Sequence, residues 1–234
     1  MRFDVITIFP NFFQPFLSEG LIKKAIDKHI LKINIHNLRD WAVDKHRTVD
    51  DRPFGGGLGM VMKVEPIYRA VESVKEQFKE NKNKKTRRIK RKIILFTPRG
   101  KKFNQNIASQ LSKMDQVILI CGRYEGVDER VAKYIADLKL SIGNYVLMGG
   151  ELPAMVVMES VVRLIPGVIG KTQLLNERIV SDSNKKGFIE YAQYTRPEVF
   201  SPKKGIKWRV PKVLISGDHK KIKEWKEKHK RIII

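Results

Sequence analysis

The sequence contains little cysteine and no paired histidines. Its 234 residues include one cysteine, Cys121, which excludes an internal disulfide and a multi-cysteine metal site and is typical of a reducing compartment. None of the five histidines lies four residues from another, the spacing with which a helix presents two imidazoles to zinc. The sequence therefore predicts no metal site held by cysteine or histidine.

Long apolar runs are also absent. The most apolar segment, 152–169, is shorter than the roughly 20 residues of a membrane span and contains Glu159 and Arg163. Near the amino end, Asp4 and Pro10 interrupt the apolar residues before any small-residue cleavage pattern, which argues against a signal peptide. We therefore expect a cytoplasmic protein that does not contact a membrane.

Acidic residues are scarce relative to basic ones. The chain has 47 Lys and Arg against 25 Asp and Glu, which leaves a formal charge of +22. The electric field of such a positive charge attracts polyanions and speeds their association with the protein, so nucleic acid is the first partner class to consider. The alternative is a compositional bias that replaces neutral surface residues by solvated lysine, because net charge reports on solubility as well as on partners.

The length predicts one large domain and a smaller one, and the apolar content of 42% is that of a chain that folds on its own. Strand-like and helix-like segments alternate from residue 93 onward, which is typical of an α/β fold with a parallel sheet. The expected strands are 3–9, 31–36, 93–97, 117–121 and 138–142, and the expected helices are 66–78, 104–113, 128–135, 152–165 and 219–230. Residues 81–92 are dense in Lys and Arg and predict a flexible basic insertion.

Three of the expected strands end in turns that contain glycine or proline, at 97–100, 121–126 and 142–145. In α/β proteins, ligands bind beyond the carboxyl ends of the strands, where glycine lets the backbone approach them closely. A single turn of this kind more often only terminates an element. Three consecutive ones, followed by Gly149 and Gly150 before an apolar helix, predict a cofactor pocket.

A run of glycines at 55–59 invites comparison with nucleotide-binding loops. It lacks the Gly-Lys-Ser/Thr ending of a phosphate-binding loop, and it does not open the first strand-to-helix turn of a dinucleotide fold. Both nucleotide interpretations are therefore rejected.

Several longer motifs occur in order along the chain, at 46–57, 121–129, 141–153, 163–168 and 194–198. With them, the chain resembles over almost its whole length the bacterial TrmD-type tRNA (guanine-N1-)methyltransferases of the SPOUT superfamily. The resemblance implies a mostly parallel α/β sheet with a deep trefoil knot, which sequence rules alone would not predict because knots are nearly absent from proteins. It further implies an obligate homodimer whose active sites are shared between the subunits.

The same resemblance divides the chain into a knotted S-adenosylmethionine-binding domain at 1–166, an interdomain linker at 167–187 and a small helical tRNA-binding domain at 188–234. The last domain is expected to be shortened, because relatives usually continue beyond Ile234. The implied reaction is methyl transfer from S-adenosylmethionine to N1 of the guanosine immediately 3′ of the anticodon in tRNA.

The resemblance also assigns roles to single residues. Asp182 takes the position of the family's catalytic aspartate, Arg163 that of its catalytic arginine, and Glu125 that of a glutamate linked to a magnesium requirement. The positions of the cofactor site are Pro98, Gly122, Ile142, Gly143, Asn144, Tyr145, Val146, Leu147 and Gly149, and those of tRNA contacts are Asp50, Arg52 and Arg196.

These residue types suit the chemistry. Guanine N1 carries a proton that a carboxylate such as Asp182 can remove, and Arg163 can stabilise the negative charge that develops on the base. The alternatives are a loop aspartate or helix cap for Asp182 and a surface ion pair at a helix end for Arg163. Cys121 has no nearby activating residue in the sequence and is interpreted as structural.

Two other functions remain open from the sequence. Asn144 stands where many relatives carry aspartate, so the chain could be a catalytically decayed homologue that still binds RNA. It could also be a related knotted methyltransferase that acts on the ribose 2′-OH.

Overall fold

The computed structural model describes residues 1–80, 89–170, 179–182 and 185–233, without the side chains of residues 79, 80, 179–182 and 185–187. The chain separates into two compact units, Met1–Thr172 and Gln173–Ile234. The division at 166 and 187 that the sequence predicts stays a prediction. Of the expected basic insertion, residues 81–88 lie outside the described residues.

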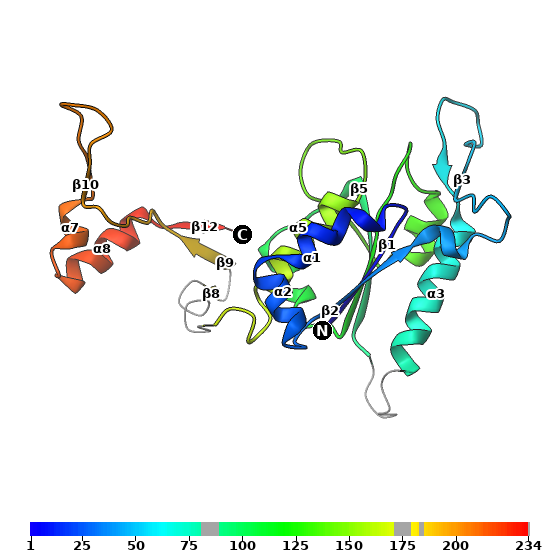
Figure 1. Ribbon diagram of the computed structural model, residues 1–234, viewed down its shortest axis with the longest axis horizontal. Helices are drawn as coiled ribbons and strands as arrows, with labels where there is room; N and C mark the ends of the chain where they lie inside the picture. Colours follow the sequence, from blue (N-terminus) through cyan, green and yellow to red (C-terminus); the bar gives the residue numbers. More distant parts are fainter. Residues whose placement is uncertain (81–88, 171–178, 183–184, 234) are drawn as a thin grey trace. The chain divides into compact units, whose positions relative to one another are not determined.

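A five-stranded sheet forms the centre of the first unit (Figure 1). Its order is β2-β1-β6-β5-β7, and every neighbouring pair is parallel, which confirms the expected α/β architecture. Each predicted strand has an observed counterpart. The strands are β1 (Arg2–Thr7), β2 (Lys32–Asn37), β5 (Arg91–Lys102), β6 (Gln116–Ile120) and β7 (Leu138–Ser141).

Helices cover both faces of this sheet, because the inner strands are apolar on both sides. In β6, Val117 and Leu119 belong to one buried core, whereas Ile118 and Ile120 belong to the other. The first core lies beneath α2 (Gly20–Asp27), α4 (Gln105–Leu111) and α5 (Glu151–Val162), and the second beneath α3 (Val64–Glu80). The remaining short elements of this unit are η1 (Pro10–Phe13), α1 (Gln14–Ser18), η2 (Leu38–Trp41), β3 (Asp50–Asp51) and β4 (Val61–Met62).

The helix expected at 128–135 is confirmed in position, since residues 129–135 are helical. It changes to π-helical geometry in η3 (Val131–Ile135), where the N–H of Ala136 donates to the carbonyl of Val131 at 2.9 Å. Asp128 begins this helix, because its carboxylate accepts from the backbone N–H of Arg130 and its carbonyl accepts from the N–H of Val131.

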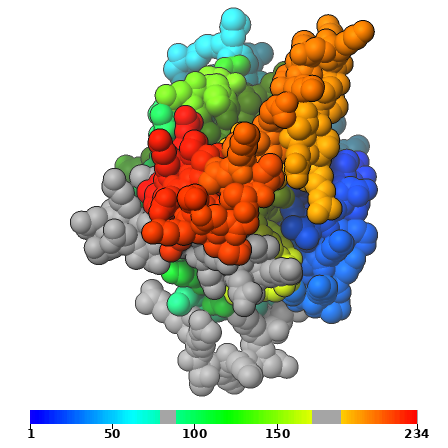
Figure 2. Space-filling view, turned by 90° about the vertical axis from the view of Figure 1, so that its left-hand side faces the viewer, coloured from blue at the N-terminus to red at the C-terminus, as the bar shows by residue number. Residues whose placement is uncertain are grey.

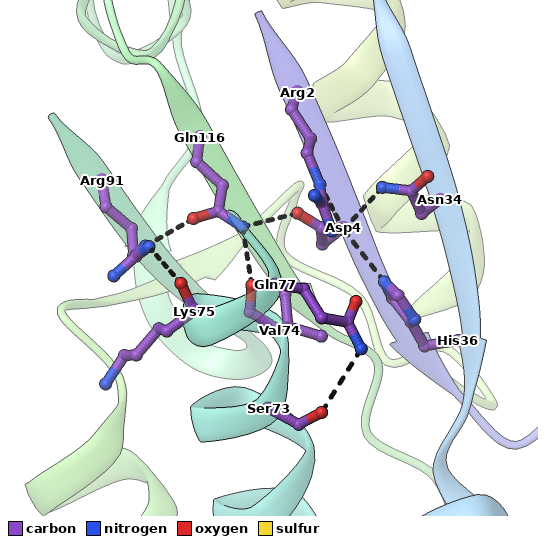
Figure 3. A network of polar contacts seen from close by, with 10 residues as sticks. All are labelled: Arg2, Asp4, Asn34, His36, Ser73, Val74, Lys75, Gln77, Arg91 and Gln116. Carbon is purple, nitrogen blue, oxygen red and sulfur yellow. Dashed lines mark hydrogen bonds and ion pairs between the residues drawn. The ribbon is translucent and has the colours of Figure 1, made fainter. Parts of the chain in front are cut away.

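A row of polar side chains crosses the amino end of the sheet beneath α3 (Figure 3). The fully buried Asp4 is its centre. One carboxylate oxygen accepts from Arg2 and Asn34 at 2.7 and 2.8 Å and lies 2.9 Å from Nε2 of His36. The other accepts from Gln116 at 2.7 Å, and Arg91 extends the row by donating to the carbonyl of Gln116's side chain at 2.5 Å. The row thus ties β2, β1, β6 and β5 together.

Burial raises the pKa of Asp4, but the hydrogen bonds from His36, Arg2 and the two amides outweigh it and leave the pKa below the ordinary 3.8. A carboxyl whose pKa is lower in the folded chain stabilises the fold above its unfolded pKa. That contribution is lost as the pH falls through the folded pKa.

Replacing Asp4 by asparagine is expected to lower the free energy of unfolding by about 3–5 kcal/mol at pH 7, because it leaves Arg2 buried without its counter-charge. The difference from wild type should shrink as the pH falls below about 4. Urea unfolding at several pH values measures it. Asp27→Asn, which breaks the exposed pair with Lys23, is the control and should change little. If the difference in the free energy of unfolding between the variant and wild type stayed constant across pH, it would contradict a lowered pKa for Asp4.

The second unit combines strands with two helices. A three-stranded antiparallel sheet has the order β12-β9-β8, and a separate hairpin of β10 and β11 projects from the helices α7 and α8 (Figures 1 and 2, orange to red). The bounds are β8 (Ile179–Asp182), β9 (Lys185–Glu190), β10 (Val199–Phe200), β11 (Trp208–Arg209), α7 (Lys212–Ile215), α8 (His219–His229) and β12 (Arg231–Ile233). The last predicted helix, 219–230, is thereby confirmed. β8 and the start of β9 lie in the stretch for which the sequence predicts a linker.

Side-chain contacts stabilise helix α8 and its packing in this unit. Asp218 begins α8 by accepting a hydrogen bond from the N–H of Lys221 at 3.1 Å. Trp225 stacks on His229 and meets the ring of Tyr194 edge-on. Among the described residues of the whole chain, no helix has the length and apolar character needed to cross a membrane.

Candidate functional site

A cavity of about 410 Å³ lies at the carboxyl ends of β5, β6 and β7. The segments 97–100, 121–126 and 142–145 all contribute to its wall, as does the segment 146–150. The turn expected at 97–100 is wrong in kind, because these residues lie within β5, where the pairing with β7 shifts between Phe96 and Lys101. The structure still brings together the segments that the sequence singled out. Among the predicted cofactor residues, Gly143 and Asn144 do not line the cavity.

Two glycines allow the chain to approach itself closely at this edge. A Cβ on Gly150 would lie 2.6 Å from Cα of Cys121, and the N–H of Gly150 donates to the carbonyl of Gly122 at 2.9 Å. A Cβ on Gly100 would lie 2.5 Å from the backbone of Leu140. Any larger residue at either position would separate backbone segments that form the cavity wall.

The loop after β7 presents its backbone to the cavity. Within the described part of the chain, the N–H groups of residues 144–149 make no hydrogen bond to another backbone group. Two side-chain hydrogen bonds stabilise the start of this loop. Ser141 Oγ donates to the carbonyl of Gly143 at 2.8 Å, and the Tyr145 hydroxyl donates to the carbonyl of Ile142 at 3.3 Å. Backbone donors beside apolar walls such as Phe96 and Leu147 suit a ligand with an aromatic ring and polar groups.

A buried ion pair that the sequence analysis missed fixes one side of the cavity. Glu151, the first residue of α5, is fully buried and accepts from the Thr7 hydroxyl at 2.7 Å and from the guanidinium of Arg123 at 2.8 Å. Arg123 lines the cavity and lies over the ring of Phe9. The sequence did contain a signal for this ion pair, because a glutamate at the start of an otherwise apolar, buried helix needs a buried partner.

Cys121 lies beneath this ion pair and is buried. Burial raises the pKa of its thiol well above the ordinary 9.0, and the charge of Glu151 raises it further. A thiol held in its protonated form is a poor nucleophile, which agrees with the structural interpretation.

Tyr124 of the 121–126 turn lines the cavity. Burial raises the pKa of Tyr124, and the charge of Asp50, in the loop expected to contact tRNA, raises it further. Asp50 itself belongs to β3, which pairs with β4. Arg52 is exposed beyond it.

The candidate catalytic residues do not all meet in this cavity. Glu125 lines it, whereas Arg163 follows the last residue of α5. Pro153 of α5 still lines the cavity, and a helix rises about 1.5 Å per residue, so the backbone of Arg163 lies roughly 15 Å farther along the helix axis. Asp182 ends β8 in the second unit, and its side chain is outside the described atoms. Arg196 is exposed in that unit.

Comparisons with known proteins identify relatives along the whole chain. Residues 1–232 match the family model described as tRNA (Guanine-1)-methyltransferase TrmD. The chain is 50% identical over 228 residues to the tRNA (guanine-N(1)-)-methyltransferase of Dictyoglomus turgidum, covering 97% of this chain and 84% of that protein. It is 47% identical to the protein of the same name from Citrifermentans bemidjiense, with the same coverage. Among solved structures, the tRNA (m1G37) methyltransferase from Aquifex aeolicus is similar with a TM-score of 0.75 and 37% identity, covering 98% of this chain and 88% of that one.

Proposed function

Because the chain belongs to the TrmD family of tRNA (guanine-1)-methyltransferases, we propose that it transfers a methyl group from S-adenosylmethionine to N1 of the guanosine immediately 3′ of the anticodon in tRNA. The observation that carries this proposal is the family match over residues 1–232. The curated relatives have the corresponding name, and the solved relative's title gives position 37 as its methylation site. The reaction takes place in the cytoplasm, where tRNA is available.

S-adenosylmethionine occupies the cavity at the ends of β5, β6 and β7. The cofactor supplies an already activated methyl group, so the protein must mainly position the base and remove its proton. The chemistry of the wall fits this ligand. The N–H groups of 144–149, which donate to no backbone carbonyl of the described residues, can bind its polar groups, and Phe96, Ile142 and Leu147 can enclose its ring. Gly143 and Asn144 act by shaping the turn that carries these donors.

Asp182 removes the proton from guanine N1, and Arg163 stabilises the negative charge on the base. A carboxylate within hydrogen-bonding distance accelerates such a step by general base catalysis, and a fixed guanidinium lowers the energy of the charged transition state. Both assignments come from the family positions of these residues.

The enzyme is a homodimer in which each site uses residues of both subunits. The first support is an apolar surface at the start of α5 that stays exposed in the single chain, formed by Val146, Met148, Leu152 and Val156. The second is the distance of roughly 15 Å along the axis of α5 between Arg163 and Pro153 of the cavity wall, which is too long for a direct contact with a guanine bound there. Arg163 therefore acts in the site of the partner subunit.

The loop after β7 passes the irregular second half of β5 and forms a trefoil knot. β5 lies between β6 and β7 in the sheet, yet Gly150 returns from β7 to the end of β6. On this path the chain crosses the residues of β5 that pair with Leu140 and Ser141. Close approach at Gly100 and Gly150 is what a threaded crossing requires.

The second unit binds tRNA through its basic and aromatic surface. On the β10–β11 hairpin, Phe200 and Trp208 are more than half exposed and contact each other, beside Lys207 and Arg209. Exposed rings can stack on unpaired bases, and cationic side chains can contact phosphates. Arg196 and, in the first unit, Arg52 and Asp50 complete the contacts with the anticodon stem and loop.

Magnesium is required through Glu125, as the family position implies. A site made of protein side chains alone does not fit, since the described residues contain no cluster of three or more His, Cys, Asp or Glu arranged to hold a metal. Magnesium can instead use one carboxylate together with water and phosphate oxygens.

Purified protein, labelled S-adenosylmethionine, magnesium and a tRNA with guanosine 3′ of the anticodon are expected to yield N1-methylguanosine at that position. Mass analysis of the nucleosides measures it, and a tRNA with adenosine there is the control. Methylation of a ribose 2′-OH would indicate the related knotted enzymes. RNA binding without uptake of S-adenosylmethionine in calorimetry would indicate a decayed homologue. Either result would overturn the proposal.

A further inference from the structure

Two loops that are far apart in the sequence are joined side by side at the cavity. The end of the glycine-rich loop, residues 59–62, lies along the cavity loop 123–128. The N–H of Glu125 donates to the carbonyl of Met60 at 3.0 Å, and the N–H of Met62 donates to that of Gly126 at 2.9 Å. Asp128 donates in turn to Met62 at 3.0 Å. The two segments therefore form one rigid wall.

Gly59 supports the side chain of Glu125 in this wall. A Cβ built on Gly59 would lie 2.5 Å from Cγ and 2.8 Å from Oε1 of Glu125, so the glutamate side chain folds over the bare backbone. Gly59 has a φ of +86°, which also favours glycine. Within the described residues, no hydrogen bond or ion pair fixes the Glu125 carboxylate. The bare backbone of Gly59 is therefore what leaves room for the glutamate side chain to take this direction.

We propose that Gly59 is a positioning residue for methyl transfer, because its missing side chain gives Glu125 the space to hold its carboxylate at the cavity. The proposal rests on the proposed function, in which Glu125 takes part in the reaction. It also gives the glycine-rich loop a task other than nucleotide binding.

Gly59→Ala is expected to slow the chemical step by roughly 10²-fold, the usual effect of displacing a reacting group by about 1 Å. S-adenosylmethionine affinity should stay unchanged, because Gly59 does not line the cavity. Single-turnover methylation of tRNA gives the rate, and calorimetry gives the affinity. Gly55→Ala is the matched control for backbone strain, since Gly55 has a φ of +84° and open space around its Cβ position.

A double-mutant cycle separates positioning from a structural effect. If Gly59 acts through Glu125, then Gly59→Ala should have no further effect in a chain that already carries Glu125→Ala. Equal slowing in both backgrounds would overturn the inference, as would a normal rate of Gly59→Ala alone.

If Gly59→Ala does not fold, the double variant Gly59→Ala with Glu125→Ala should fold as well as Gly55→Ala, because the obstructing glutamate side chain is gone. Failure of the double variant to fold would also overturn the inference. A normal rate of Glu125→Ala would remove Glu125 from the proposed mechanism, and this outcome is distinct from the others.

Discussion

Replacing Asp182 by alanine is expected to lower the rate of methyl transfer by roughly 10²–10⁴-fold, the range that general base catalysis contributes. S-adenosylmethionine affinity should stay close to normal, because the cavity is built from residues of the first unit. Single-turnover assays with saturating tRNA measure the rate, and calorimetry measures the affinity.

The matched control for Asp182→Ala is Ser181→Ala, which changes the neighbouring residue of β8 without removing a carboxylate. It should retain the wild-type rate. Asp182→Asn should be as slow as the alanine variant, since an amide does not accept the proton from N1. Full activity of either Asp182 variant would remove this residue from the mechanism.

Arg163→Ala is expected to slow the chemical step by roughly 10²–10³-fold, as does the loss of one fixed donor to a developing anion. The affinity for tRNA should fall much less. Arg196→Ala is the informative comparison, because an arginine that contacts phosphate should weaken tRNA binding and leave the chemical step unchanged at saturation. An Arg163 variant that only binds tRNA more weakly would contradict the catalytic role.

Mixed dimers test which subunit Arg163 serves. Leu147→Trp, on the cavity wall, should block S-adenosylmethionine binding and inactivate the homodimer. Heterodimers of this variant with Arg163→Ala should regain activity, because the open cavity of one chain would receive the intact arginine of the other. No recovery despite demonstrated subunit exchange would place Arg163 in the site of its own chain.

The sheet and the cavity were predictable because they depend on local patterns. Apolar strands such as β6 are recognisable without knowledge of their neighbours, and parallel strands necessarily bring their carboxyl ends to one edge. The segments at 97–100, 121–126 and 142–145 could therefore be assigned to one pocket before the structure was known.

Features that depend on contacts between distant residues could not be predicted in this way. The pairing of Glu151 with Thr7 and Arg123 joins residues up to 144 positions apart, and nothing in their own segments specifies the partner. The same is true of Glu125 above Gly59. The helix at 129–135 could be predicted from its pattern, but its change to π-helical geometry from Val131 onward could not. The roles of Asp182 and Arg163 stay predictions from the family.

The strand order also governs how the chain can be assembled during synthesis. β1 emerges from the ribosome early, but its second neighbour, β6, is made only after residue 115, and β6 must enter between β1 and β5. Until then, one edge of β1 has no hydrogen-bonding partner, and an exposed edge of this kind promotes aggregation. Asp4 likewise acquires its donor from Gln116 only at this stage. The amino-terminal half alone therefore lacks both the strand that pairs with this edge of β1 and one of the donors that satisfy the buried carboxylate of Asp4.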